Sequence, residues 1–423
     1  MQDTNLNIRF ISFKVLYEVF FNKKLLNELF EQSVDNITLS DKDKSFIRFE
    51  CKGVIENVDT IDGIIDKHSK VKTKKLDKDI LIILRLGVFE IKYMDKVPAF
   101  ATVNEYVGIV KKTKKYHLAN FVNAVLRNVE RSIDKNVNDK ELTTPRIGKA
   151  NKNCYFRIYN DGEDKVVNEL ISKGIKYSKY EGALDFKYAK VYKVDSFTKI
   201  INLETFKDGY ILIQDASSTY LTDKMASFIK DDLKTSNTEN ISMMKLLDVC
   251  AAPGGKILGL IDLIYSDFYY FYAEARDISE DKIYKICENV NRLKVLDLNM
   301  NVKDGSRYDE VDKDKFDVVI CDVPCTGLGV VAKKPDIILN FDKEKINSLL
   351  PLQKKILDTS SKYVKVGGII SYSTCTTTRE ENEDVIESFL KENNNFEKIY
   401  EKRIDVDDEN AADGFYMCFM RRL

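Results

Sequence analysis

Long apolar runs and histidines are scarce in this chain of 423 residues. No stretch of about 18 apolar residues occurs, so the sequence predicts no membrane-spanning helix. The opening residues, MQDTNLNIRF, lack the basic and then apolar order of a secretory signal, and we therefore expect a cytoplasmic protein without membrane contact. The two histidines, His68 and His117, lie far from the paired cysteines of CDVPC (321–325), so we expect no metal site.

Cysteine is spread thinly along the chain, which excludes a disulfide scaffold as the basis of the fold. Cys325 and Cys375 stand apart because each follows a strand-like apolar run, in CDVPCTG and in SYSTCTT. A thiol that only fills a core needs no such position, so we predict chemistry for these two. We predict simple packing for five others, which are Cys51, Cys154, Cys287, Cys321 and Cys418.

The chain is too long for one hydrophobic core, and its pattern changes along its length. Residues 1–132 carry apolar residues at three- and four-residue spacing with a single proline, which predicts an all-α bundle. Residues 133–153 are polar and are typical of a linker. Residues 154–238 predict a small α+β unit. Within 239–423, apolar strands alternate with helices, which predicts an α/β doubly wound, mostly parallel sheet.

The helical region has a small basic excess. Residues 1–130 contain 22 Lys and Arg against 18 Asp and Glu, and the excess lies in KVKTKK (70–75) and KKTKKYH (111–117). Such runs are commonly solvated helix ends, and a phosphate-binding patch is the alternative. Both interpretations stay open from the residues alone.

A turn of small residues, DVCAAPGGK (248–256), joins the first strand of the predicted sheet to its helix. Gly254 and Gly255 let a ligand approach the backbone, and the following helix offers unpaired N–H groups. The turn matches neither the dinucleotide fingerprint nor the P-loop, because Lys256 is followed by Ile257. A ligand-binding turn and a plain tight turn therefore remain alternatives.

Three acids lie at successive strand ends, on the edge where doubly wound sheets bind ligands. Asp277 ends the second strand, Asp304 the third and Asp322 the fourth. A carboxylate at the second strand can accept the hydroxyls of a ribose, and Glu274, three residues earlier, is the alternative to Asp277. Several carboxylates without a phosphate clamp suit a cationic nucleoside, so we predict S-adenosylmethionine as the cofactor.

Several blocks of the chain resemble a known family. DVCAAPGGK, DVVICDVPCTGLGVVAKKPDI and SYSTCTTTREENE are similar to signature blocks of RNA cytosine-C5 methyltransferases, most closely the bacterial RsmB group. FVNAVLRNVER and the helices before it resemble the NusB-like domain fused to those enzymes, and ADGFYMCFMRR (412–422) resembles their closing hairpin. The resemblance covers nearly the whole chain. It departs at the short polar stretch 133–153 and at AEARD (273–277), where Glu274 and Arg276 replace small or apolar residues.

This resemblance implies methylation of C5 of a cytosine in small-subunit ribosomal RNA that is not yet fully assembled, by a monomer that binds RNA through its NusB-like domain and its small α+β unit. It implies that Cys375 is the nucleophile, that Cys325 assists breakdown of the covalent adduct, and that Asp322 holds N3 of the cytosine. It places the cofactor on Asp277, Asp304, Asp322 and the glycine turn. The turn residues are Cys250, Ala251, Ala252, Pro253, Gly254, Gly255 and Lys256.

Covalent catalysis explains why such a reaction requires thiols. A thiolate that adds to C6 of cytosine makes C5 nucleophilic enough to attack a methyl donor. Thr378 and Glu381 have the spacing of a capping box, which predicts a helix just after Cys375 whose positive end lowers the pKa of the thiol.

Three alternatives remain from the sequence. A tRNA methyltransferase would carry the same catalytic blocks. A non-catalytic RNA-binding or antitermination factor would use the helical domain, with the sheet as a scaffold. A DNA-type cytosine methyltransferase would take its nucleophile from the block that contains Cys325 and would not need Cys375.

Overall fold

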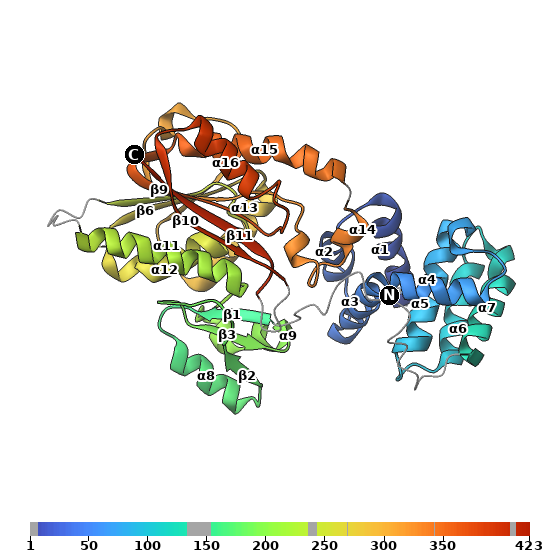
Figure 1. Cartoon of the computed structure of the whole chain (residues 1–423). Helices are drawn as coiled ribbons and strands as arrows, with labels where there is room; N and C mark the ends of the chain where they lie inside the picture. Colours follow the sequence, from blue (N-terminus) through green and yellow to red (C-terminus); the bar gives the residue numbers. More distant parts are fainter. Residues whose placement is uncertain (1–6, 133–153, 236–242, 269, 342, 407–411) are drawn as a thin grey trace. The chain divides into compact units, whose positions relative to one another are not determined.

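The computed structural model describes residues 7–132, 154–235, 243–268, 270–341, 343–406 and 412–423 (Figure 1). The chain divides into two compact units. Unit 1 comprises Met1–Ala150 and Val331–Phe341, and unit 2 comprises Asn151–Val330 and Asp342–Leu423. The predicted linker 133–153 lies outside the described residues, and the boundaries of the four predicted segments stay a prediction. Within the described ranges, no helix combines the length and the apolarity needed to cross a membrane.

Unit 1 is an all-α bundle, as the apolar spacing predicts. The amphipathic helix α7 buries Val122, Leu126 and Val129 and leaves its other face polar, whereas α5 is buried on all sides from Ile80 to Ile91 and forms the centre of the bundle. The helices are α1 (Ile8–Asn22), α2 (Leu26–Phe30), α3 (Asp41–Glu56), α4 (Val58–His68), α5 (Lys78–Tyr93), α6 (Ala99–Lys111), α7 (Ala119–Ser132) and α14 (Asp336–Leu339). The last of these comes from a segment 200 residues beyond the others, which the sequence pattern did not indicate.

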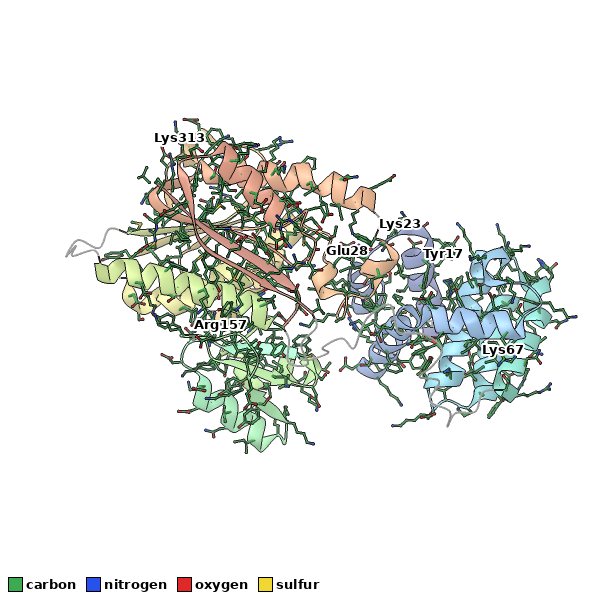
Figure 2. The ribbon with its side chains drawn as sticks, viewed as in Figure 1. Tyr17, Lys23, Glu28, Lys67, Arg157 and Lys313 are labelled. Carbon is green, nitrogen blue, oxygen red and sulfur yellow. The ribbon has the colours of Figure 1, made fainter. Side chains whose placement is uncertain are left out.

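Unit 2 begins with a four-stranded antiparallel sheet of order β2-β3-β1-β4. Its elements are β1 (Cys154–Ile158), α8 (Glu163–Ser172), β2 (Tyr177–Lys179), β3 (Val191–Val194), α9 (Phe197–Ile201), α10 (Glu204–Lys207) and β4 (Ile211–Ile213). The buried Arg157 of β1, labelled in Figure 2, extends to the neighbouring helix α12 (Gly255–Ile264) and pairs with Asp262 at 2.6 Å. This ion pair fixes the small sheet to the larger one.

The larger sheet has seven strands in the order β10-β11-β9-β8-β5-β6-β7. Its strands are β5 (Met244–Asp248), β6 (Phe271–Asp277), β7 (Leu298–Val302), β8 (Phe316–Asp322), β9 (Val364–Thr374), β10 (Phe396–Ile404) and β11 (Phe415–Arg422). Strands β5 to β9 pair in parallel, and β10 and β11 add an antiparallel hairpin beside β9.

Helices cover both faces of this sheet (Figure 1). One face packs against α11 (Ala216–Thr235), α12 and α13 (Glu280–Leu293), and the other packs against α15 (Lys343–Ser361) and α16 (Glu383–Glu392). Along β8, Val318 and Ile320 enter the first core, whereas Val319 and Cys321 enter the second. A parallel strand buried on both faces is apolar throughout, which explains the continuous run DVVIC and confirms the predicted doubly wound fold.

The strand order brings the chemically interesting loops together. The strand order reverses at β5, which has β6 on one side and β8 on the other. The connections after β5 and β8 therefore run in opposite directions at the carboxyl ends of the strands and leave between them the crevice where such sheets bind ligands. The loops after β5, β6, β8 and β9 therefore share one edge of the sheet.

Candidate functional site

The two predicted catalytic cysteines meet at this edge. β8 and β9 pair in parallel with Asp322 opposite Ser373, so Cys325, three residues past β8, and Cys375, one residue past β9, emerge side by side. Their sulfur atoms lie 3.3 Å apart, and both residues are half-buried. The hydrogen bond with Cys375 and burial raise the pKa of the Cys325 thiol well above its ordinary value. Because two adjacent sulfurs resist double ionisation, one of them keeps its proton.

A buried carboxylate holds the two cysteine loops against each other. Glu381 accepts hydrogen bonds from the Thr326 backbone N–H at 2.9 Å, from the Thr378 hydroxyl at 2.8 Å and from Gln353 Nε2 at 2.9 Å. Thr326 directly follows Cys325, and Thr378 lies three residues past Cys375. This carboxylate therefore fixes the spacing of the sulfurs.

The capping-box prediction is wrong at this position. α16 begins at Glu383, with Asn382 as its N-cap, so no helix starts just after Cys375. Thr378 does contact Glu381, but the Glu381 carboxylate also accepts hydrogen bonds from Thr326 and Gln353 across the site. Sequence spacing alone could not reveal these distant donors.

An ion pair lies beside the thiols. Lys256, from the glycine turn, places Nζ 2.5 Å from Asp322 Oδ2, and the Ser373 hydroxyl donates to Asp322 Oδ1 at 2.7 Å. Burial opposes the charge on Lys256, but the carboxylates of Asp322 and Asp248 and the Cys375 sulfur together outweigh burial, so the pKa of the ammonium is raised. The Asp322 carboxylate is thus held by two donors, one from the first turn of α12 and one from β9.

The glycine turn is organised by Asp277. Its carboxylate accepts the backbone N–H of Ala252 at 2.9 Å and that of Ile278 at 2.8 Å, and Lys282 pairs with it at 2.9 Å. Gly254 has a φ of 95°, in the left-handed region that favours glycine. Asp277, at the end of β6, therefore lies directly against the turn at the end of β5.

Glu274, the alternative to Asp277, has different partners. It accepts from Arg276 Nε at 2.7 Å, and Arg276 Nη2 pairs with Asp312 at 2.6 Å, all three being buried. The unusual AEARD segment thus forms an internal ion network. Since Glu274, Arg276 and Asp312 bond to one another, the Glu274 carboxylate is used in this network and not at the glycine turn.

Asp304 closes the loop after β7. Its Oδ1 accepts the backbone N–H of Ser306 at 2.9 Å and the Ser306 hydroxyl at 2.7 Å, and these bonds lower the pKa of the Asp304 carboxyl. Its side chain keeps 30% of its surface exposed, so it still faces outward at the ligand edge.

One residue of the site, Asp248, was missed by the sequence analysis. It ends β5, is only 1% exposed, and its Oδ2 is buried without a hydrogen-bond partner among the described residues. Burial raises the pKa of this carboxyl to about 8, although Lys256 opposes the shift. The signal was present in DVCAAPGGK: the reasoning applied to acids at the ends of the second, third and fourth strands applies equally to the first.

These residues fit a cationic nucleoside. Asp248, Asp277 and Asp322 end three strands that share one edge, Asp304 lies two residues past the end of a fourth, and the unsatisfied buried oxygen of Asp248 points to a missing polar partner there. Among the described residues, no group of three or more His, Cys, Asp or Glu side chains is arranged to hold a metal ion.

Comparison with known proteins assigns the chain to families. The sequence profile described as 16S rRNA methyltransferase RsmB/F matches residues 233–420, and that of the NusB family matches residues 6–131. This chain joins an RsmB/F methyltransferase domain to a NusB domain. The RsmB/F match covers the glycine turn, the three strand-end acids and both cysteine loops. It agrees with S-adenosylmethionine as the cofactor and with a methyltransferase rather than an idle scaffold.

Two relatives align with this chain over nearly their full length. The chain is 28% identical to "Ribosomal RNA small subunit methyltransferase B" of Proteus mirabilis, with 99% of each protein covered. It is 25% identical to "Probable ribosomal RNA small subunit methyltransferase B" of Bacillus subtilis, covering 98% of this chain and 99% of that protein. The crystal structure of PH0851 matches with a TM-score of 0.73 over 100% of both chains at 17% identity, which shows the shared fold.

Proposed function

We propose that this RsmB/F-family protein transfers a methyl group to C5 of a cytosine in small-subunit ribosomal RNA, the position-967 cytosine of the RsmB group. The observation that carries the proposal is the pair of sulfurs 3.3 Å apart, beside the Lys256–Asp322 ion pair. A core thiol needs neither a second thiol nor an ion pair. The names of the full-length relatives support ribosomal RNA as the substrate.

Cys375 acts as the nucleophile. Its thiolate adds to C6 of the cytosine, a carbon–sulfur bond forms, and the ring loses its aromaticity, so electron density moves to C5. Asp322 binds at N3 and holds the base in position, with Lys256 and Ser373 fixing the carboxylate. S-adenosylmethionine, when bound, supplies the methyl group that C5 attacks.

Cys325 acts in the second half of the reaction. The C5 proton of the methylated ring passes to water, the electrons of that C–H bond restore the C5–C6 double bond, and the carbon–sulfur bond breaks so that Cys375 leaves as a thiolate. Cys325 lies 3.3 Å from Cys375, and its raised pKa keeps it as a thiol, so its S–H can donate a hydrogen bond to the departing thiolate.

The residues that would hold S-adenosylmethionine line the edge formed by the first four parallel strands of the chain. The glycine turn from Cys250 to Lys256 would face the cofactor with its backbone, Asp277 would accept the ribose hydroxyls and Asp304 would border the adenine. Asp322 would serve both the cofactor and the target base. The orphan oxygen of Asp248 supports a polar group bound nearby.

The RNA must present an unpaired or flipped-out cytosine, because C5 and C6 are hidden within a duplex. The NusB domain and the small sheet of unit 2 hold the surrounding RNA. In support, the lysine runs of the NusB domain are largely solvent-exposed, including Lys72, Lys74, Lys112 and Lys114. We propose that the protein acts as a monomer.

Methylation in vitro tests the proposal. The purified full chain is incubated with S-adenosylmethionine and with small-subunit ribosomal RNA or total tRNA, and both products are mapped by bisulfite sequencing. We expect one new 5-methylcytosine in the ribosomal RNA and none in tRNA. Methylation of tRNA alone would replace the ribosomal substrate with a tRNA, and no methylation of either RNA would refute the proposal.

A further inference from the structure

The loop that carries Cys325 continues into a different unit. The chain passes from unit 2 into unit 1 at Val331, forms the one-turn helix α14, and returns to unit 2 at Asp342. Only four residues separate Cys325 from Val330, the last residue before this excursion. Unit 1, which contains the NusB domain, therefore includes a segment that directly follows the proposed catalytic loop in the chain.

The near end of this loop is fixed on the nucleophile. The backbone N–H of Gly329 donates to the carbonyl oxygen of Cys375 at 3.0 Å, and Gly414 donates to the carbonyl of Gly329 at 2.9 Å. A Cβ atom at Gly329 would lie 2.1 Å from the Gly414 oxygen, so no larger residue fits there. Within unit 2, Gly329 thus ties this loop to the backbone of Cys375.

The far end is fixed by Asp336. Helix α2 begins at Leu26, and its N-cap, Leu25, has no side-chain acceptor for the unpaired N–H groups of the first turn. Leu26 is fully buried, so water cannot replace the missing acceptor. Asp336, 310 residues further along the chain and itself 3% exposed, accepts this N–H at 3.0 Å (α2 and α14, Figure 1).

Apolar packing supports the same contact. Leu339 packs against the core of the helical bundle, and Pro335, Ile338 and Leu339 line a small crevice with Ile55 and Val58. The segment is thus embedded in the NusB domain and not merely adjacent to it.

We propose that Asp336 is a positioning residue: by capping α2 it holds the far end of the Cys325 loop, so the NusB domain helps to set the geometry of the two cysteines. This role rests on the proposed function and goes beyond RNA binding by that domain. A small displacement of reacting groups lowers rates strongly, by up to about a hundredfold for 1 Å.

The test compares matched variants of the full chain. Asp336→Leu removes the acceptor, and Asp336→Asn keeps one. Leu26→Pro removes the donor from the other side; proline is tolerated at the first helical position, and Leu25 already has the extended φ of −77° and ψ of 133° that proline requires. Leu29→Ala is the control, because it loses apolar packing on the same helix without touching the hydrogen bond.

Three quantities are measured for each variant: kcat for methyl transfer, cofactor affinity by calorimetry, and hydrogen exchange of residues 326–335. We expect Asp336→Leu and Leu26→Pro to lower kcat about tenfold, to leave cofactor affinity unchanged and to speed exchange of the loop. Asp336→Asn and Leu29→Ala should stay within about twofold of the wild type in kcat. The double variant Asp336→Leu/Leu26→Pro should have a kcat no lower than that of the less active single variant, because both changes break the same contact.

The inference would be overturned if Asp336→Leu kept the kcat and the loop exchange rate of the wild type. It would also be overturned if Leu29→Ala lost as much kcat as Asp336→Leu. If the wild type methylates no RNA, the proposed function fails, and hydrogen exchange alone still decides whether Asp336 holds the loop.

Discussion

Two neighbouring halves of one sheet edge present the same kinds of side chain in different states. At the ends of β5 and β6, Asp248 and Asp277 are almost completely buried, whereas at the ends of β8 and β9 Asp322, Cys325 and Cys375 are half-buried. Asp277 accepts one backbone N–H on each carboxylate oxygen, from Ala252 and Ile278, and Asp248 keeps an orphan oxygen. Burial holds the acids of the cofactor side in place, and partial exposure leaves the reaction side open to a base.

The two halves differ because burying a charge costs free energy. A buried carboxylate must be paired, neutralised or matched by a ligand, and the first half of the edge contains one paired and one neutralised example. A group that attacks a substrate cannot be covered in this way. Changes on the reaction side should therefore abolish chemistry and spare cofactor binding, and changes on the cofactor side should affect affinity or stability.

The largest effect is expected at the thiols. Cys375→Ala should reduce methyl transfer below detection, because no sulfur remains to add to C6, while calorimetry should show unchanged cofactor affinity. Cys325→Ala should instead accumulate enzyme bonded to RNA, visible as a shifted band on a denaturing gel. Cys287→Ala, a half-buried cysteine on α13, is the control and should behave as the wild type. A trapped adduct in Cys375→Ala would reverse the roles and restore the DNA-type mechanism.

The next largest effect is expected at the ion pair of Lys256. Lys256→Met leaves the Asp322 carboxylate without its cation and without one of the two donors that fix it, and we expect kcat to fall about a hundredfold, equivalent to about 2.7 kcal/mol in the barrier. Lys282→Met provides the contrast, because Lys282 pairs with Asp277 but is about half exposed. Steady-state kinetics should show less than a twofold change for Lys282→Met. Equal falls in kcat in the two variants would mean that burial of the Lys256–Asp322 pair does not matter for activity.

A smaller effect is expected on cofactor binding. Asp277→Asn exchanges one acceptor oxygen for a donor facing the turn, and we expect the Kd of S-adenosylmethionine to rise about tenfold, equivalent to about 1.4 kcal/mol. Glu274→Gln should leave the Kd unchanged and lower the melting temperature, because Glu274 serves the Arg276 network. Calorimetry on both variants decides between the two acids, and the opposite pattern would move the ribose site to Glu274.

The smallest effect concerns stability and pH. Asp248 has a pKa of about 8 in the folded chain and an ordinary value near 3.8 when unfolded, so the folded state holds a proton that the unfolded state loses between these values. Stability of the wild type should therefore fall as pH rises from about 4 to 8, by up to about 1.4 kcal/mol per pH unit from this group.

Asp248→Asn does not titrate, so its melting temperature should rise relative to the wild type between pH 5 and pH 8. The exposed Asp281→Asn on α13 is the control and should show no such trend. A constant difference between Asp248→Asn and the wild type would show that Asp248 is ionised in the fold.

Much of this protein is determined by local patterns in its sequence. Apolar spacing specifies the helices of unit 1, alternation specifies the doubly wound sheet, and the residues after each strand specify which side chains reach its ligand edge, because strand ends are local features. The predicted location of Asp277, Asp322, Cys325 and Cys375 at strand ends follows from this.

Tertiary structure alone decided which partners the buried polar side chains bind. Glu381 binds Thr326 and Gln353 instead of capping a helix, Arg276 pairs with Asp312, and Asp336 caps a helix that starts 310 residues earlier. Each of these contacts joins residues far apart in the chain. A buried polar group bonds to whichever partner the packing brings within reach, and no local pattern encodes that choice.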